Sequence, residues 1–133
     1  MGKITIAENE LYSLYFHEEE KIVHHVMHKL IVGDPFKTLL TKGLNLLKEK
    51  KAVKWLSDDK KNPRFSGVDY EWATKEWFPK VLAEGWKYWA VVLPEEVHAQ
   101  MFLKHYSKLY SDFGLEVKLF TNPEDAFEWL KSK

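Results

Sequence analysis

Two adjacent carboxylates, Asp58 and Asp59, are the residues of this sequence best placed for chemistry, and they follow Ser57 where a strand is expected to end. Ligands of open α/β sheets gather at the carboxyl ends of parallel strands. Two carboxylates there could hold Mg²⁺ beside a phosphate, so an enzyme using them is our third hypothesis. Neighbouring residues of an extended chain point in opposite directions, however, and Lys60 and Lys61 can act as counter-ions. The favoured interpretation is a solvated loop that makes contacts through both aspartates.

Six histidines raise the question of a metal site. His24 and His28 share a face of a predicted strand, but four residues of strand separate them by about 13 Å. His98 and His105 lie two turns apart on a predicted helix, which is also too far for one ion. Zinc needs three or four ligands in a tight tetrahedron. We expect scattered histidines and no metal; a site assembled from different elements is the alternative.

Motifs for other chemistry are missing from the sequence. The glycines fall singly, so no phosphate-binding loop is present, and no Gly-x-Ser-x-Gly elbow occurs. The chain has no cysteine, which excludes disulfides, thiolate catalysis and cysteine-bound zinc. These observations predict a protein without a cofactor and without enzymatic activity.

A dense band of aromatic residues surrounds the predicted helix 67–84 and the strand that follows it. Its members are Trp72, Trp77, Phe78, Trp86, Tyr88 and Trp89. One interpretation is ordinary packing of the helix on the sheet. The other is a pocket or a self-association face. Trp72 and Phe78 are the candidates for that face because they lie off the inner stripe of the helix, and Met101 and His105 on the next helix could adjoin them.

The element that organises the chain is the apolar run Trp89 to Leu93, which follows Gly85 and is stopped by Pro94. An uninterrupted apolar run of this length predicts a strand buried on both faces of a sheet. We therefore expect this strand in the middle of the sheet, with helices above and below it.

The remaining elements follow from hydrophobic periodicity and from turn residues. Strands are expected at 10–16, 21–31, 52–56 and 115–120, with a short edge strand possible at 4–7, and helices at 34–51, 67–84, 95–113 and from 122 onward. Strand alternation puts Ile22, His24 and Val26 on one face and His25 on the other. The order ββαβαβαβα predicts an α/β fold in one domain, 1–133, with a mixed, mainly parallel five-stranded sheet and four helices.

Local signals predict how two of the helices begin and bend. Asp34 is expected as the N-cap of the first helix, with Pro35 at its first position. Ser66 or Asp69 can cap the second helix. Pro79 lies inside this second helix and should bend it or start a new turn.

Charge and hydropathy limit the partners. The 133 residues contain 20 Lys and Arg against 20 Asp and Glu. Nucleic-acid binding usually needs a basic excess or stripe, so no nucleic-acid partner is expected. No apolar run approaches the ~20 residues that span a bilayer, and the first residues lack the apolar core of a signal peptide. We expect a cytoplasmic protein without a membrane span.

Nearly the whole chain resembles the SpoIIAA-like fold, the group that contains STAS domains and, more distantly, Sec14-type lipid-binding domains. The resemblance rests on the element order, on Glu76-Trp77-Phe78-Pro79 before Gly85, on the strand Ala90 to Pro94 and on the segment Asn122 to Leu130. It is greatest to small stand-alone bacterial proteins of this fold, whose function is generally unassigned. The resemblance implies the fold more specifically than it implies an activity.

In anti-sigma-factor antagonists of the STAS family, a partner kinase phosphorylates a serine in an Asp-Ser-Ser-Gly-like turn. The matching turn here is Phe65-Ser66-Gly67, in which Ser66 and Gly67 fit and the preceding loop is longer and basic. Ser66 and Ser57 are therefore the candidates for phosphorylation or partner contact. The alternative is that Ser66 only caps the following helix.

Two function hypotheses from different classes lead. The first is a non-enzymatic regulatory or protein-interaction domain, which presents a helix face and the loop 57–66 to a protein partner or associates with itself, a homodimer being possible. The second is a small-molecule or lipid-binding domain, as the relationship to Sec14-type domains implies. The second needs an apolar pocket of ~300 Å³ or more between sheet and helices.

Overall fold

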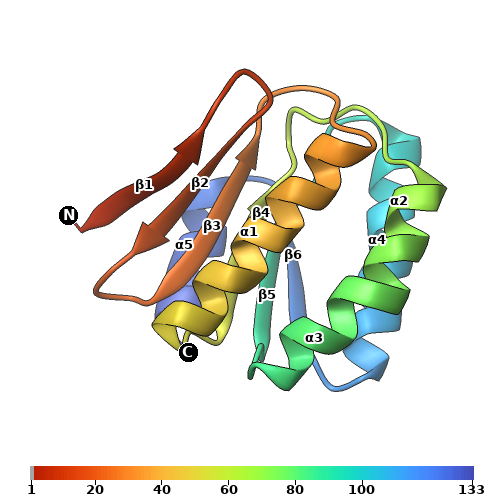
Figure 1. Cartoon of the computed structure of the whole chain (residues 1–133). Helices are drawn as coiled ribbons and strands as arrows, with labels where there is room; N and C mark the ends of the chain where they lie inside the picture. The colour runs from red at the N-terminus through yellow and green to blue at the C-terminus, as the bar shows by residue number, and fades with distance from the viewer. Residues whose placement is uncertain (1) are drawn as a thin grey trace.

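A computed structural model describes residues 2–133 of the chain (Figure 1). The strands are β1 (Lys3–Glu8), β2 (Tyr12–His17), β3 (Ile22–Met27), β4 (Lys54–Asp58), β5 (Tyr88–Val92) and β6 (Glu116–Phe120). The helices are α1 (Asp34–Lys50), α2 (Gly67–Trp72), the π-helical turn η1 (Ala73–Trp77), α3 (Phe78–Ala83), α4 (Val97–Asp112) and α5 (Pro123–Lys131). The predicted α/β class is confirmed.

The strands form one mixed sheet in the order β1-β2-β3-β4-β5-β6. β1, β2 and β3 pair antiparallel, and β3, β4, β5 and β6 pair parallel. The prediction of five strands is wrong in number, because the possible edge strand at residues 4–7 is a full strand, β1. Most of its side chains are exposed, and the polar–apolar alternation of residues 3–6 covers only four residues, the shortest run that indicates a strand.

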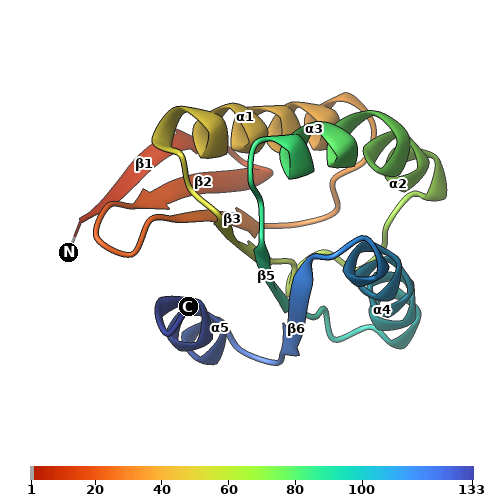
Figure 2. The same cartoon turned by 90° about the horizontal axis from the view of Figure 1, so that it is seen from below.

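The helices are divided unequally between the two faces of the sheet. The connections from β3 to β4, from β4 to β5 and from β5 to β6 contribute α1, the segment α2–η1–α3, and α4, whose buried residues share one large core. Helix α5 covers the opposite face, where it packs on β4, β5 and β6. Figure 2 shows α1, α2 and α3 on one side of the twisted sheet and α5 on the other.

Strand β5 is buried from both sides, as predicted. Trp89 and Val91 belong to the large core under the crossover helices, whereas Ala90 and Val92 pack in the smaller core under α5. The predicted position in the middle of the sheet is not met: β5 is an interior strand, but it lies between β4 and the edge strand β6. The apolar run in the sequence therefore reflects two different helical layers that need apolar contacts from alternate residues.

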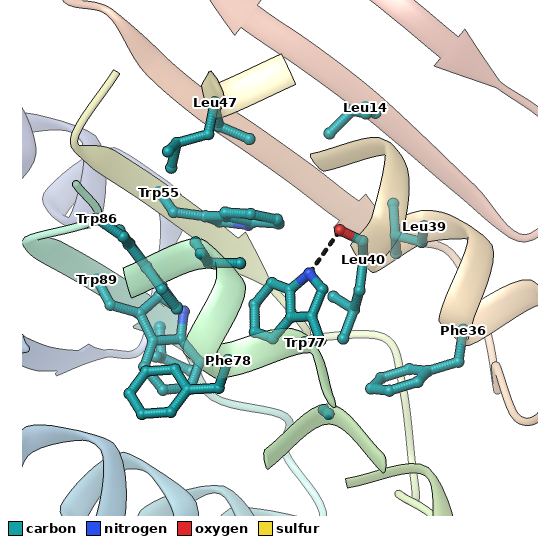
Figure 3. Close-up of a cluster of buried hydrophobic side chains, with 14 of the residues drawn as sticks. Leu14, Phe36, Leu39, Leu40, Leu47, Trp55, Trp77, Phe78, Trp86 and Trp89 are labelled. Atoms are coloured by element: carbon teal, nitrogen blue, oxygen red, sulfur yellow. Dashed lines mark hydrogen bonds between the residues drawn. The ribbon is translucent and has the colours of Figure 1, made fainter. Parts of the chain in front are cut away.

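The large core is built from indole rings (Figure 3). Trp55 meets Trp77 edge to face, with ring centroids 5.4 Å apart, and lies 5.6 Å from Trp86. The Trp77 indole N–H donates to the Leu40 carbonyl oxygen at 2.7 Å, which satisfies its buried donor. The packing interpretation of the aromatic band holds for Trp77 and Trp86, both of which are buried.

Local details of the helices match the sequence signals in part. Helix α1 is capped at Gly33 instead of Asp34, one residue earlier than predicted, with Pro35 in its first turn. The segment around Pro79 contains the predicted irregularity: η1 is a π-helical turn directly before α3, and the Phe78 N–H bonds to the Ala73 oxygen five residues back. Such π-bulges relieve the conflict between a proline ring and the preceding turn.

Candidate functional site

The loop between β4 and α2 is fastened at every third residue. Asp59, Asn62 and Phe65 are 1%, 0% and 8% exposed. The residues between them, Lys60, Lys61, Pro63 and Arg64, are exposed. The three buried side chains act as anchors that hold the loop against the core, whereas the three cations and the proline face solvent. We refer to residues 59–65 as the anchored loop.

The first anchor is a buried hydrogen bond between Asp59 and a histidine on β3. The imidazole Nε2 of His25 lies 2.7 Å from Asp59 Oδ1, and the Trp55 indole N–H donates to His25 Nδ1 at 3.1 Å. An indole nitrogen can only donate, so His25 Nδ1 must be an acceptor and the ring proton lies on Nε2. His25 therefore donates to the Asp59 carboxylate oxygen, and both ring nitrogens are occupied.

The second anchor is the fully buried side chain of Asn62. Its backbone N–H donates to the Asp59 carbonyl oxygen at 3.0 Å, and its Nδ2 lies 3.3 Å from Met27 Sδ. Its Oδ1 accepts from the Arg64 N–H at 3.3 Å. Asn62 thus ties the loop to the end of β3 and holds the backbone next to Arg64.

The third anchor is Phe65, which enters an aromatic cluster between α2 and α4. Its ring stacks on Phe102, with centroids 5.8 Å apart and an interplanar angle of 10°. It also meets Tyr70 edge to face at 5.8 Å. Burial, and next the charge of Asp59, raise the pKa of Tyr70 well above its usual value, so its hydroxyl stays protonated beneath the loop.

Ser66 ends the loop as the N-cap of α2. Its Oγ accepts the Asp69 N–H at 3.2 Å. The Asp69 carboxylate, itself buried, accepts the Gly33 N–H at 2.9 Å and so joins the start of α2 to the start of α1. The capping interpretation of Ser66 is confirmed, and its phosphorylation remains a prediction.

Two adjoining hollows lie beside the anchored loop, at the carboxyl ends of the parallel strands. They measure about 510 and 560 Å³ and share Pro63 and Glu96 in their walls. The first is mainly apolar, whereas the second is charged. Their walls also include Leu30, Arg64, Phe65, His98, Ala99 and Phe102 in the first and His28, Lys60, Lys61 and Glu95 in the second. We refer to both together as the edge groove.

Ser57 and Asp59 do not belong to a solvated loop, so the expectation that they make surface contacts is wrong. Strand β4 continues to Asp58, two residues beyond the predicted end. Ser57 is buried at 3% exposure, and its Oγ accepts the Trp89 indole N–H at 2.8 Å. A partner or a kinase cannot reach either side chain in the folded chain. The sequence could not show this because the partners of both residues lie on other strands.

Asp58 points to the opposite face of the sheet and lines a different hollow, of about 460 Å³, beside α5. Its neighbours there include His17, His24, Glu124 and Glu128. Burial raises the pKa of Asp58 above its usual value, while a hydrogen bond from the Lys60 N–H partly opposes the shift. Because Asp58 and Asp59 lie on opposite faces, they cannot hold one magnesium ion together.

The histidines separate into different environments. His24 Nδ1 lies 3.0 Å from His17 Nε2, and His28 Nε2 lies 2.8 Å from Ser13 Oγ. Burial, and next the charge of His17, lower the pKa of His24 to about 3. Within residues 2–133, no group of three or more His, Asp or Glu side chains is arranged to hold a metal ion.

The interior of the described chain has little free volume. A cavity of about 20 Å³ lies between the sheet and the crossover helices, lined in part by His25, Ser57, Tyr70 and Tyr110. That volume admits about one water molecule, whereas a small-molecule pocket needs ~300 Å³ or more. Large aromatic side chains occupy the space that a lipid chain would need.

The four candidates for an aromatic face are dispersed. Phe78 is buried and stacks on Tyr110 at 3.8 Å, so it cannot contribute to an exposed face. Trp72 is half-buried, with the Lys37 ammonium 5.5 Å from its ring. Met101, which is 61% exposed, and the exposed His105 lie one turn apart on the outer side of α4.

Sequence reasoning missed several residues of these surfaces, including Glu95, Glu96, His17, Glu124 and Glu128. Glu96 is the N-cap of α4, where its carboxylate accepts the Ala99 N–H at 2.9 Å. The acidic pair before this helix was the available signal, but it indicated only a helix start. His17 and the α5 glutamates line the same hollow, and no spacing in the sequence indicates that these distant residues come together.

The fold and the site define an α/β protein with a six-stranded mixed sheet, which carries an anchored basic loop and a groove at the carboxyl edge. Searches against protein-family models, curated proteins and solved structures each give no match. No helix within residues 2–133 has the length and apolar character needed to traverse a bilayer.

Proposed function

We propose that the chain is a non-enzymatic protein-interaction domain whose anchored loop and edge groove bind an acidic segment of a partner protein. One observation carries this proposal: buried side chains hold the loop at every third residue while Lys60, Lys61 and Arg64 face solvent. An ordinary solvated loop would not need three buried anchors. A rigid loop loses little conformational entropy when a partner binds, so its contacts translate more fully into affinity.

The chemistry of the groove suits a peptide with both acidic and apolar residues. Lys60, Lys61 and Arg64 supply positive charge, and Arg64 can bind a carboxylate with two parallel hydrogen bonds. The apolar wall formed by Pro63 and Phe102 offers a place for one or two side chains between the charged groups. Glu95 and Glu96 oppose the cations across the groove and would disfavour a uniformly acidic ligand.

The residues with catalytic potential support binding more than chemistry. Both ring nitrogens of His25 are engaged in the core, and the Ser57 hydroxyl accepts a hydrogen bond from Trp89. A general base has to lie within hydrogen-bond reach of its substrate, and these groups are buried. The lipid-binding alternative would need interior space that the aromatic core occupies.

The resemblance to STAS domains agrees with a partner-binding role, because those domains act through protein partners. Ser66 lies directly beyond the anchored loop and two residues from Arg64. A phosphate at Ser66 would sit at a helix start and could pair with Arg64. In this proposal, phosphorylation of Ser66 would compete with an acidic partner and weaken its binding.

A peptide-display selection tests the proposed function. The chain is immobilised, and a random peptide library is counter-selected against the variant K60E/K61E/R64E. We expect enriched peptides that are acidic with at least one apolar residue, bind the wild-type chain, and lose about tenfold or more in affinity with the triple variant. A control variant, K104E/K108E/K131E, changes as many exposed cations on α4 and α5 and should bind normally.

Two results would refute the proposal. One is a selection that enriches no peptide above background. The other is a set of peptides that bind the triple variant and the control variant equally well. Circular dichroism of each variant checks that the fold is intact, which is expected because all six substituted side chains are exposed.

A further inference from the structure

Strand β1 forms an edge of the sheet, away from the anchored loop, and carries two exposed apolar side chains. It pairs with β2 on one side only. Ile4 and Ile6 are 41% and 42% exposed. An edge strand presents unpaired backbone N–H and C=O groups along its free side. Exposed isoleucines next to such groups mark a surface on which another strand can be added.

A groove runs between β1 and α1 and continues this surface. It measures about 370 Å³, and its walls include Ile4 and Ile6 from β1 and Lys42, Leu46 and Glu49 from α1. Figure 2 shows α1 lying over the β1–β2 side of the sheet. Because Ile4 and Ile6 of the edge strand line this groove, a chain added at that edge would lie beside the α1 residues of the groove.

The charges along both elements are self-complementary. β1 begins with Lys3 and ends with Glu8. Ile6 is the extra residue of a bulge, because Thr5 and Ala7 face consecutive residues of β2. In an antiparallel pair of β1 strands in which Lys3 faces Glu8 of a second copy, the two-fold axis therefore passes at Thr5. Opposite charges then face each other at both ends of the pair, an arrangement that stabilises cross-strand contacts.

Helix α1 also presents one cation and one anion to this groove, Lys42 and Glu49, while the neighbouring Lys50 pairs with Glu18. Lys42 and Glu49 lie at equal distances in sequence from the midpoint between residues 45 and 46. Asn45 and Leu46 line the groove together with Ile4 and Ile6, so the midpoint of this helical segment lies beside the midpoint of β1. A two-fold axis there brings Lys42 of each copy toward Glu49 of the other. Neither residue forms an ion pair within residues 2–133.

We propose that two copies of this chain associate through β1 and the adjoining face of α1, in a two-fold symmetric dimer whose sheets join edge to edge. A second copy is the occupant because the order of charges complements itself on two elements about one axis. The register of β1 shifts between Thr5 and Ala7, and such bulges shorten edge-to-edge ladders. The isoleucines and the α1 charges therefore contribute most of the association.

Sedimentation velocity of the full chain, from about 1 µM to about 500 µM, tests this inference in a range where modest interfaces dissociate. We expect a concentration-dependent species of twice the 15.8-kDa mass of the chain. The variant I6K should remain monomeric. The control V32K changes another exposed aliphatic residue, outside the groove, and should dimerise like the wild type.

A charge swap tests the two-fold arrangement with variants that are expected to fold, because Lys42 and Glu49 are exposed. K42E or E49K alone places like charges opposite each other twice in the dimer and should weaken association about tenfold. The double variant K42E/E49K restores opposite charges and should recover wild-type association.

A wild-type chain that is monomeric over the whole range would overturn the dimer. So would equal association of I6K and V32K. A double variant as weak as the single variants would overturn the proposed axis. Because the anchored loop lies on another surface, these outcomes are independent of the peptide-binding proposal.

Discussion

Replacing Gly43 by alanine should destabilise the chain, although alanine is the better helix former. Gly43 lies in the middle of α1, where alanine is favoured over glycine by about 1 kcal/mol. A Cβ at this position, however, would lie 2.1 Å from Trp55 Cη2 and 2.5 Å from Trp55 Cζ2. Carbon atoms in contact normally stay ~3.5–4.0 Å apart. The indole ring or the helix would have to move by more than 1 Å.

The Trp55 ring has little room to yield. It is 1% exposed, with Trp77 and Trp86 packed against it and its N–H bonded to His25. Overpacking a core of this kind costs about 1–3 kcal/mol and occasionally more. The size of the overlap places Gly43→Ala at the upper end, so the net loss should be about 2 kcal/mol after the gain in helix preference.

Gly67→Ala is the matched control. Gly67 is the first residue of α2, and a Cβ there would meet no atom within 4 Å. Its stability should stay equal or rise by up to about 1 kcal/mol. Urea unfolding, followed by circular dichroism and by tryptophan fluorescence, measures both variants. If Gly43→Ala were as stable as Gly67→Ala, Trp55 could not be seated under α1 as described, and the arrangement of the aromatic core would be refuted.

Three further predictions concern the polar groups. The pKa of His24 is about 3 in the folded chain and 6.5 in the unfolded chain. The stability that His24 contributes is therefore fully present above pH 6.5 and decreases as the pH falls, because only the unfolded chain then takes up a proton. At pH 5 this single group should lower the free energy of unfolding by about 2 kcal/mol. Urea unfolding at pH 7 and pH 5 should show that loss in the wild type and in the surface control His105→Gln, but not in His24→Gln; equal losses in all three would contradict the assignment. Ser66→Ala removes the cap of α2 and should cost about 1 kcal/mol in thermal or urea unfolding, whereas Ser66→Asp keeps a capping oxygen and should cost less; an equal loss would argue against the cap. Asp59→Ala leaves the buried His25 N–H without its acceptor and should cost about 1–3 kcal/mol, whereas Asp59→Asn retains an acceptor and should be milder; the reverse order in urea unfolding would contradict the hydrogen bond.

The parts of the fold that the sequence predicts are those in which one residue pattern has one structural cause. β5 is apolar on both faces because two layers cover it, and the hairpin residues alternate because each face of β2 and β3 meets a different environment. The same reasoning fails for β1. Its alternation of polar and apolar residues is only four residues long, and its side chains are mostly exposed, so the sequence predicts no more than a possible short edge strand.

Only the position of the candidate site in the chain could be predicted from the sequence, and not the roles of its residues. The end of β4 was expected to carry polar residues of interest, and the anchored loop begins there. The roles of Ser57, Asp58 and Asp59 depend on partners far along the chain: Trp89, the hollow at His24, and His25. Sequence spacing carries no information on such pairings, because strand order and register decide them.

The buried pair of Asp59 and His25 raises the question of what such a pair contributes in an aromatic core. Buried ionic contacts are weak evidence for stability, because apolar residues of similar size often replace them without loss. A directional hydrogen bond does something that an apolar contact cannot: it fixes the residue from which the exposed part of the loop starts. The position of Asn62 depends on the same residue, because the Asn62 N–H donates to the backbone carbonyl oxygen of Asp59. The backbone at Arg64 depends in turn on Asn62, because the Arg64 N–H donates to Asn62 Oδ1.

This series of hydrogen bonds predicts a specific pattern of amide hydrogen exchange. In Asp59→Ala, the amides of Asn62 and Arg64 should exchange faster by a larger factor than the amides of β5, because the loop loses its anchor before the core opens. In Asp59→Asn, the loop amides should keep most of their protection. If Asp59→Ala accelerated exchange equally in the loop and in β5, the pair would serve the stability of the core alone. The exposed cations would then have no special support, and the argument for a preorganised binding loop would lose its physical basis.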